Sequence, residues 1–327
     1  MPFLTRRFLA ALVLTCVALP ASSQPYPARP VSLLIPWAAG GGSDAMGRMV
    51  GALLEQDLKQ PVIVVNRAGG GGVVGHSAIA AAAPDGYTLG LATMEISIFR
   101  TMGLADITPQ SYTPIARLAA LDAAVIVRTD APYGNARDLL DAIRKAPEGK
   151  FKASGSGQGS AWHLALGGWL LAEGIKTTHV RYVPSAGASA SLQELVASGV
   201  EFCTCSATEA RSLIDAGKLR VLAIMAPKRS DLYPNVPTLK EATGTDWQMA
   251  SWFAVVAPKG LDPQLAAQLT AALNRVHERA EFRSFLKERG FSPAWETGAD
   301  FAQYAATSTK RLDTVTEAMG LKKPVAP

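Results

Sequence analysis

Apolar segments of strand length alternate with helical patterns along almost the whole chain of 327 residues. Apolar runs bounded by turn residues are typical of strands that are buried on both faces. Strands are expected at Val31–Ile35, Val62–Val65, Tyr87–Ala92, Ala123–Val127, Phe151–Ala153, Thr178–Tyr182, Val200–Cys205, Val221–Met225 and Phe253–Ala257. Helices are expected at Asp44–Leu58, Val73–Ala83, Ala136–Lys145, Trp162–Glu173, Ala190–Ser198, Glu209–Ala216, Pro263–Ala280 and Ala299–Met319. This alternation predicts an α/β fold with parallel or mixed sheets flanked by helices.

Two glycine-rich loops each follow an apolar run and precede helical sequence. The first is Pro36-Trp37-Ala38-Ala39-Gly40-Gly41-Gly42-Ser43-Asp44, and the second is Arg67-Ala68-Gly69-Gly70-Gly71-Gly72. Each loop is expected to lead into a helix N-terminus, where free backbone N–H groups and the helix dipole favour an anion. Two such loops in one chain indicate a binding site for a negatively charged molecule.

Small-residue loops occur in both halves of the chain, at 37–43 and 67–72 and again at 154–160 and 184–191. Sheets of this class bind ligands at the carboxyl ends of their strands, so the ligand is expected in a cleft between two lobes. We place the first lobe at residues 24–128 and 249–327, and the second lobe at residues 129–248.

The N-terminus has the layout of a secretory signal peptide. Arg6 and Arg7 precede an apolar stretch from Phe8 to Leu19, and small residues follow, so cleavage is expected near Ser23 and the mature protein is expected in the periplasm. The remaining cysteines, Cys203 and Cys205, are read either as buried small residues, as a strained redox pair or as part of a metal site.

Several function classes lack support in the sequence. The formal charge of +5 is dispersed, which gives no case for nucleic acid. A G-x-G-x-x-G match at Gly70–Gly75 lies in a glycine-rich run and in an exported chain, so a dinucleotide site is disfavoured. Ser160 and His163 lack an orienting acid, so a satisfied polar pair is favoured over a hydrolase site. No catalytic residue, metal site or cofactor is predicted.

Six ordered blocks resemble the solute receptors of tripartite tricarboxylate transporters, often called the Bug family. They are Tyr26-Pro27-Ala28-Arg29-Pro30-Val31, Pro36–Asp44, Asn66–Gly72, Pro84-Asp85-Gly86-Tyr87, Ala216-Gly217-Lys218-Leu219-Arg220 and Pro234-Asn235-Val236-Pro237-Thr238. The resemblance covers nearly all of the mature chain. It implies a two-lobed periplasmic-binding-protein fold that closes on a carboxylate, which is held largely by backbone amides.

The resemblance also implies where the ligand is held. Carried over onto this sequence, ligand contacts are expected at Ala39, Gly40, Gly41, Gly42, Ser43, Asp44, Ala68, Gly69, Gly70, Gly71, Thr93, Ser154, Ser156, Gly157, Ser160, Pro184, Ser185, Gly187 and Ser206. For Asp44, an alternative is a helix cap. One block departs from the family pattern, because Ser185 and Ala186 stand where the family often has an aromatic and a basic residue. The ligand is therefore expected to be bulkier or less charged than a simple dicarboxylate.

The sequence thus predicts a monomeric periplasmic receptor for a small organic acid that serves the membrane subunits of a tripartite tricarboxylate-type transporter. Two alternatives remain open at this point. One is a ligand sensor that docks on a membrane signalling protein, and the other, less favoured, is an exported enzyme on the same scaffold.

Overall fold

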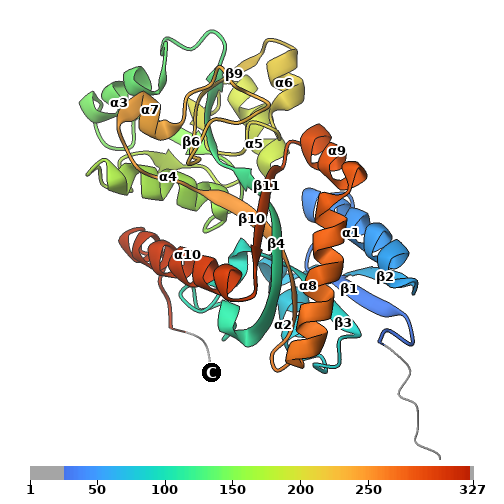
Figure 1. Ribbon diagram of the computed structural model, residues 1–327. Helices are drawn as coiled ribbons and strands as arrows, with labels where there is room; N and C mark the ends of the chain where they lie inside the picture. Colours follow the sequence, from blue (N-terminus) through green and yellow to red (C-terminus); the bar gives the residue numbers. More distant parts are fainter. Residues whose placement is uncertain (1–25, 325–327) are drawn as a thin grey trace, which may run out of the picture.

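The computed structural model describes residues 26–324 and divides them into two lobes, each built on one sheet (Figure 1). The strands are β1 (Val31–Ile35), β2 (Val62–Asn66), β3 (Thr88–Thr93), β4 (Tyr112–Asp122), β5 (Ala124–Arg128), β6 (Lys152–Ser154), β7 (Arg181–Tyr182), β8 (Phe202–Cys203), β9 (Leu219–Ile224), β10 (Ala250–Pro258) and β11 (Ser292–Thr297). The helices are α1 (Gly42–Leu58), α2 (Val73–Ala80), α3 (Ala136–Lys145), α4 (Ala161–Ala172), α5 (Ala188–Val196), α6 (Arg211–Asp215), α7 (Leu239–Thr243), α8 (Pro263–Glu278), α9 (Ala280–Arg289) and α10 (Gly298–Ala318). The predicted two-lobed α/β fold is confirmed. The predicted signal peptide, residues 1–23, lies outside the described residues.

The first lobe contains a six-stranded mixed sheet in the order β11-β4-β10-β3-β1-β2. Strand β1 pairs in parallel with both β2 and β3, because a helical crossover returns the chain to the same edge of the sheet each time. Strand β10 is antiparallel to β3 and β4, and β11 is antiparallel to β4. The loops that follow β1 and β2 therefore emerge side by side at one edge of this sheet.

The second lobe contains a five-stranded sheet in the order β7-β6-β8-β5-β9. Strand β6 is parallel to β7 and β8, whereas β5 is antiparallel to β8 and β9. The predicted lobe boundary at residue 128 follows β5, which pairs within this smaller sheet. The boundaries themselves stay a prediction.

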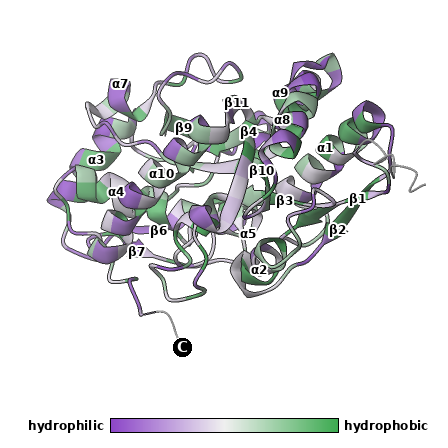
Figure 2. Ribbon diagram, turned by 60° about the horizontal axis from the view of Figure 1, so that its bottom comes forward, coloured by the Kyte–Doolittle hydropathy of each residue, from purple (hydrophilic) through white to green (hydrophobic). Residues whose placement is uncertain are grey.

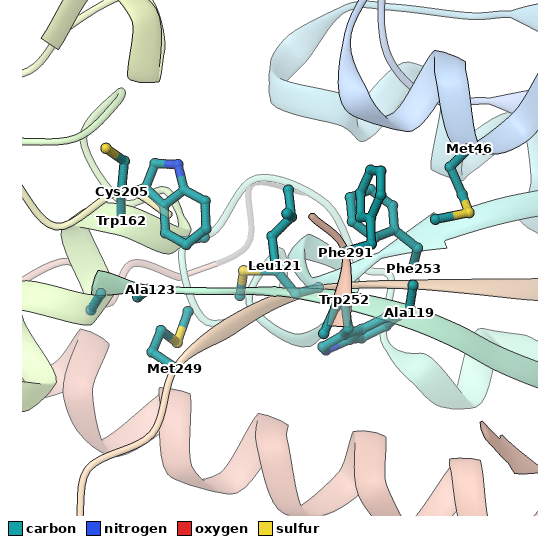
Figure 3. Close-up of a cluster of buried hydrophobic side chains, with 14 of the residues drawn as sticks. Met46, Ala119, Leu121, Ala123, Trp162, Cys205, Met249, Trp252, Phe253 and Phe291 are labelled. Carbon is teal, nitrogen blue, oxygen red and sulfur yellow. The ribbon is translucent and has the colours of Figure 1, made fainter. Parts of the chain in front are cut away.

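Two chain segments cross between the lobes side by side. The first joins β4 to β5 through Ala123, and the second leads back through Met249 into β10. The backbone N–H of Ala123 donates to the carbonyl of Met249 at 2.8 Å, and that of Met225 donates to the carbonyl of Ala123 at 2.7 Å. Figure 3 shows buried side chains on both sides of this crossing, with Leu121 between Trp162 and Phe291. One hydrophobic core thus runs through both lobes.

Helices cover the sheets, and α10 reaches both lobes. It packs on β4 in the first lobe and on α4 in the second, where the hydroxyl of Thr177 donates to the carbonyl of Ala318 at 3.2 Å. Figure 2 shows hydrophobic residues along β1 and β2 and hydrophilic residues on α7 and α9. Across residues 26–324, no helix is both long and apolar enough to cross a membrane.

Four helices and strands were missed by the sequence patterns: β4, β11, α7 and α9. Strand β4 contains Pro114 and Arg117, so it lacks a clean apolar run, and it forms because β10 and β11 pair with it on either side. The helix expected at Pro263–Ala280 ends at Glu278, and a second helix begins at Ala280. The extended backbone of Arg279, with φ −65° and ψ 139°, separates the two.

Candidate functional site

The first glycine loop delivers the N-terminus of α1 to the space between the lobes. Gly41 is its N-cap residue and has extended backbone angles, and no side chain caps the helix. The carboxylate of Asp44 accepts hydrogen bonds from the N–H of Gly40 at 2.9 Å, from Arg48 Nε at 3.1 Å and from Asn66 Nδ2 at 2.9 Å. The bond from Arg48 is the main cause that lowers the pKa of Asp44 to about 2. Asp44 thus stays ionised and holds the loop closed.

The second glycine loop follows β2 and is tied to β3 through a buried histidine. Residues Gly69 to Gly72 have consecutive positive φ angles, a run that only glycine adopts readily. His76 Nδ1 lies 2.8 Å from the carbonyl oxygen of Gly72, and Nε2 accepts a hydrogen bond from the N–H of Thr93 at 3.2 Å. The Thr93 hydroxyl in turn accepts a bond from the indole N–H of Trp37 at 3.2 Å. Both glycine loops therefore share one hydrogen-bonded frame.

The third loop, from Gly155 to Ser160, leads into α4 in the second lobe. Ser160 is the N-cap residue, yet its hydroxyl donates to the carbonyl of Gly157 at 2.6 Å rather than capping the helix. His163 Nδ1 accepts from the N–H of Gly159 at 2.9 Å, its ring stacks on Tyr182, and burial lowers its pKa to about 4. Ser160 and His163 thus bond to the loop backbone and not to each other.

The fourth loop leads into α5, also in the second lobe. Gly187 is the N-cap residue, and no side chain caps this helix. Ser185 holds the loop in place, since its N–H donates to the carbonyl of Ser156 at 3.1 Å and its hydroxyl donates to the carbonyl of Gly187 at 2.9 Å. The third and fourth loops are thereby joined to each other.

These loops surround a cavity of about 990 Å³ between the lobes. Three uncapped helix N-termini open onto it, at Gly41–Ser43 of α1, Ser160–Ala161 of α4 and Gly187–Ala188 of α5. Helices α2, α6, α9 and α10 also lack side-chain caps. The distinctive feature is therefore the convergence of three N-termini, from both lobes, on one space. Their free N–H groups and aligned dipoles make this space favourable for an anion.

Most of the residues that the sequence singled out lie around this cavity. The predicted residues that line it are Ala39, Gly41, Gly42, Ser43, Gly71, Thr93, Ser156, Gly157, Ser160, Ser185 and Gly187. Those that do not line it are Gly40, Asp44, Ala68, Gly69, Gly70, Ser154, Pro184 and Ser206. Asp44 is used by the loop itself, and the buried hydroxyl of Ser154 donates to the carbonyl of Val183 at 2.6 Å. Ligand contact by each residue stays a prediction.

Large apolar side chains, which the sequence reasoning missed, form much of the cavity wall. They are Trp37, Ile98, Phe99, Met102, Leu121, Trp162, Phe253 and Phe291. Trp37 belongs to the first glycine loop, so its place in the cavity wall could have been predicted from that motif. Trp162 directly follows the third loop, two residues after Ser160, whereas the others come from distant parts of the chain and carry no local signal.

Three acidic residues that the sequence reasoning missed also line the cavity: Glu95, Glu209 and Glu288. Glu209 is exposed, and its Oε2 accepts hydrogen bonds from the N–H of Ser206 at 3.1 Å and from its hydroxyl at 3.0 Å. Although the residue as a whole is exposed, desolvation of its carboxyl group raises the pKa of Glu209, and the bonds from Ser206 and from the indole of Trp162 oppose this rise. Glu95 Oε2 is buried without a hydrogen-bond partner in the described structure, and burial raises the pKa of Glu95. The predicted contact Ser206 thus positions Glu209.

The described part of the chain contains neither a cluster of metal-binding side chains nor an accessible thiol. Within residues 26–324, no three His, Cys, Asp or Glu side chains are placed to share a metal ion. Cys203 and Cys205 are free and fully buried. Burial raises the pKa of the Cys203 thiol to about 12 and that of Cys205 well above its usual value. Both behave as small buried side chains.

The chain matches known proteins over nearly its whole length. The family model described as "Tripartite tricarboxylate transporter family receptor" matches residues 46–321. A UPF0065 protein from the gbd 5′ region of Cupriavidus necator is 32% identical over 96% of this chain and 94% of its own length.

Two solved structures extend these matches to the fold. A TctC solute binding protein from Polaromonas is 32% identical, with a TM-score of 0.79 over 89% of this chain and 99% of that one. An R. palustris protein solved with adipate is 26% identical, with a TM-score of 0.75 over 90% of this chain and 98% of that one. A match to the family model over most of the chain establishes that this protein belongs to the tripartite tricarboxylate transporter receptor family.

Proposed function

We propose that this protein is a periplasmic receptor that captures a small organic acid between its lobes and delivers it to the membrane subunits of a tripartite tricarboxylate-type transporter. The observation that carries the proposal is the convergence of the uncapped N-termini of α1, α4 and α5 on one cavity. Membership of the receptor family and the relative solved with adipate support a carboxylate as the ligand.

The carboxylate is held by backbone N–H groups at the helix N-termini, with the hydroxyls of Ser43, Ser156 and Ser185 beside them. Because these groups belong to both lobes, the ligand contacts all of them only when the lobes are closed. Binding therefore shifts the population toward the closed form. The size of this shift is set by the difference between the ligand's affinities for the closed and the open form. The lobes move about the two crossing segments, near the predicted boundaries at residues 128 and 248. The receptor acts as a monomer and without a cofactor.

A thermal-shift screen of organic acids tests the ligand class. A ligand present at about 100 times its dissociation constant stabilises the native state by about 2.7 kcal/mol, which is a readily measured shift in Tm. Carboxylates are expected to raise Tm. Stabilisation only by neutral or cationic solutes would contradict the anion site, and turnover of the stabilising ligand would favour an enzyme.

A pair of matched substitutions at Gly41 tests the role of the helix N-terminus. Its backbone has φ −87° and ψ 179°, and a Cβ there meets nothing within 4 Å, so both Gly41→Asp and Gly41→Asn fit and can cap α1. The two variants differ in charge alone. Gly41→Asp is expected to weaken carboxylate binding far more than Gly41→Asn, while both keep the stability of the parent. Equal binding by the two variants would argue against an anion at this helix end.

The membrane partner is tested separately. Affinity capture from detergent-solubilised membranes, with and without the stabilising acid, is expected to retain transporter subunits. Retention of a membrane signalling protein instead would identify the chain as a sensor.

A further inference from the structure

The carboxylate of Glu209 is held at one place in the cavity wall of the second lobe. Ser206 and Glu209 hold each other, because the N–H of Glu209 donates to the Ser206 hydroxyl at 3.2 Å while Oε2 accepts both bonds from Ser206. This is the reciprocal arrangement of an S-x-x-E capping box. The box accounts for the rigidity of Glu209, but it does not require a charge, since glutamine serves equally well in that position.

The charges around the cavity are arranged unequally. Positive potential comes from the three helix N-termini, whereas Glu95, Glu209 and Glu288 are the acidic residues of the wall. The arginines that line the cavity are Arg211 and Arg289. Arg211 is already engaged, because it pairs with Asp215 at 3.7 Å and donates to the carbonyl of Glu288 at 3.3 Å.

A ligand with two carboxylates therefore meets two different environments in this cavity. One carboxylate finds backbone N–H groups, whereas the other end of the ligand can reach the part of the wall where Ser206 holds Glu209. Two carboxylates that lie close together repel each other, and the repulsion grows as the effective dielectric constant of their surroundings falls. An ammonium group meets an attractive, fixed partner at the same place, and the apolar wall of Trp37, Phe99 and Phe253 accommodates the methylene groups that join the two ends.

We propose that Glu209 binds an ammonium group of the ligand, so that the receptor selects amino-carboxylates over dicarboxylates. The proposal rests on the proposed function, in which the helix N-termini bind the carboxylate end of the ligand. Glu209 is then a specificity-determining residue of the cleft.

Three six-carbon acids test this assignment because they differ only at one end: 6-aminohexanoate, adipate and hexanoate. Their affinities are measured by isothermal titration calorimetry on the mature protein, on Glu209→Gln and on Glu281→Gln. Glutamine keeps the capping box, so Glu209→Gln is expected to fold with an unchanged Tm. Glu281 is an exposed acid on α9 outside the cavity wall, and its substitution controls for net charge.

The mature protein is expected to bind 6-aminohexanoate about tenfold more tightly than adipate, as a charged hydrogen bond gained in place of a repulsion implies. Glu209→Gln should lose that preference, with 6-aminohexanoate weakened and adipate strengthened, while hexanoate is unchanged. Glu281→Gln should behave like the parent. A purely structural role for Glu209 predicts equal changes for all three acids and would overturn the proposal.

Two further outcomes would overturn the role of Glu209 in binding an ammonium group, but they leave open whether the protein is a carboxylate receptor. One is a preference for adipate that survives in Glu209→Gln, and the other is the absence of binding by all three acids. Whether the protein binds carboxylates at all is decided by the wider acid screen, so the two ideas fail separately.

Discussion

The backbone N–H of Thr93 donates a hydrogen bond to Nε2 of His76 over 3.2 Å. An acceptor at Nε2 requires the proton of the neutral ring to lie on Nδ1, which then donates to the carbonyl of Gly72 at 2.8 Å. The ring is fully buried, and this burial lowers the pKa of His76 to about 4. One neutral imidazole therefore fixes the second glycine loop to the end of β3.

This arrangement predicts that the protein loses stability in mild acid. Between pH 6.5 and pH 4 the unfolded state binds a proton at His76 and the native state does not, so the free energy of unfolding falls as the pH falls. The free energy of unfolding that is lost through His76 is about 3 kcal/mol at pH 4, and this loss begins only as the pH falls below about 6.5. Urea unfolding at a series of pH values measures the total loss, and His76→Gln should remove only the part due to His76, because His163, whose pKa is also about 4, still contributes over the same pH range. Titration of His76 near pH 6.5 by NMR would disprove this account.

The close approach of the two glycine loops predicts a cost for a single methyl group at Gly75. A Cβ there lies 2.4 Å from Pro36 Cα and 2.6 Å from the carbonyl oxygen of Arg67, both of them backbone atoms. Gly75→Ala is expected to lower the free energy of unfolding by about 2 kcal/mol, although alanine is the better helix former. Gly41→Ala, which meets nothing, is the control and should change stability by less than about 1 kcal/mol. Equal stability of the two variants would refute the packing argument.

The ion pair that joins β4 to β11 is expected to matter more than exposed pairs. Arg117 donates to both carboxylate oxygens of Glu296, is 9% exposed, and stacks on the ring of Tyr304 at 3.8 Å. Arg117→Met leaves Glu296 without its partner and should cost about 3 kcal/mol in urea unfolding. The exposed pair of Lys322 and Glu317 supplies the comparison, where Lys322→Met should cost less than about 1 kcal/mol. Similar losses in both variants would count against a special role for Arg117.

The buried thiols predict an inert native protein. Cys203 donates weakly to the carbonyl of Ser191 at 3.4 Å, and neither it nor Cys205 is accessible. Iodoacetamide is expected to leave the native mature protein unlabelled and to modify both cysteines after unfolding in urea, because only the accessible thiolate reacts. Intact mass spectrometry reads the result. Rapid labelling of the native protein, or a mass that shows a disulfide, would contradict it.

Substitutions in the fourth loop are expected to change which acids the protein binds. Ser185 and Ala186 line the cavity, where the family pattern often has an aromatic and a basic residue. Replacing them together, as Ser185→Tyr with Ala186→Lys, adds a ring and a positive charge to the second-lobe wall. The double variant should bind short dicarboxylates more tightly than the parent does in the same thermal-shift screen. An unchanged profile would mean that this loop does not set specificity.

Much of the fold was predictable because its signals are local. Strand β1 was predicted at its observed bounds, as was helix α3, whose apolar face and Asn135 cap are both visible in the sequence. Strand β4 was missed because its pairing with β10 and β11 compensates for Pro114 and Arg117. Those partners are more than 120 residues away in the chain, and no local pattern reports them.

The sequence by itself determined the alternation of strands and helices and the glycine loops that end at helix N-termini. These features depend on backbone conformation and on neighbouring residues. Only the tertiary structure decided that Glu209, Leu121 and Phe291 meet in the wall of one cavity. The physical reason is that a cavity wall is made by contacts between distant segments, and its charge depends on what those segments bring together.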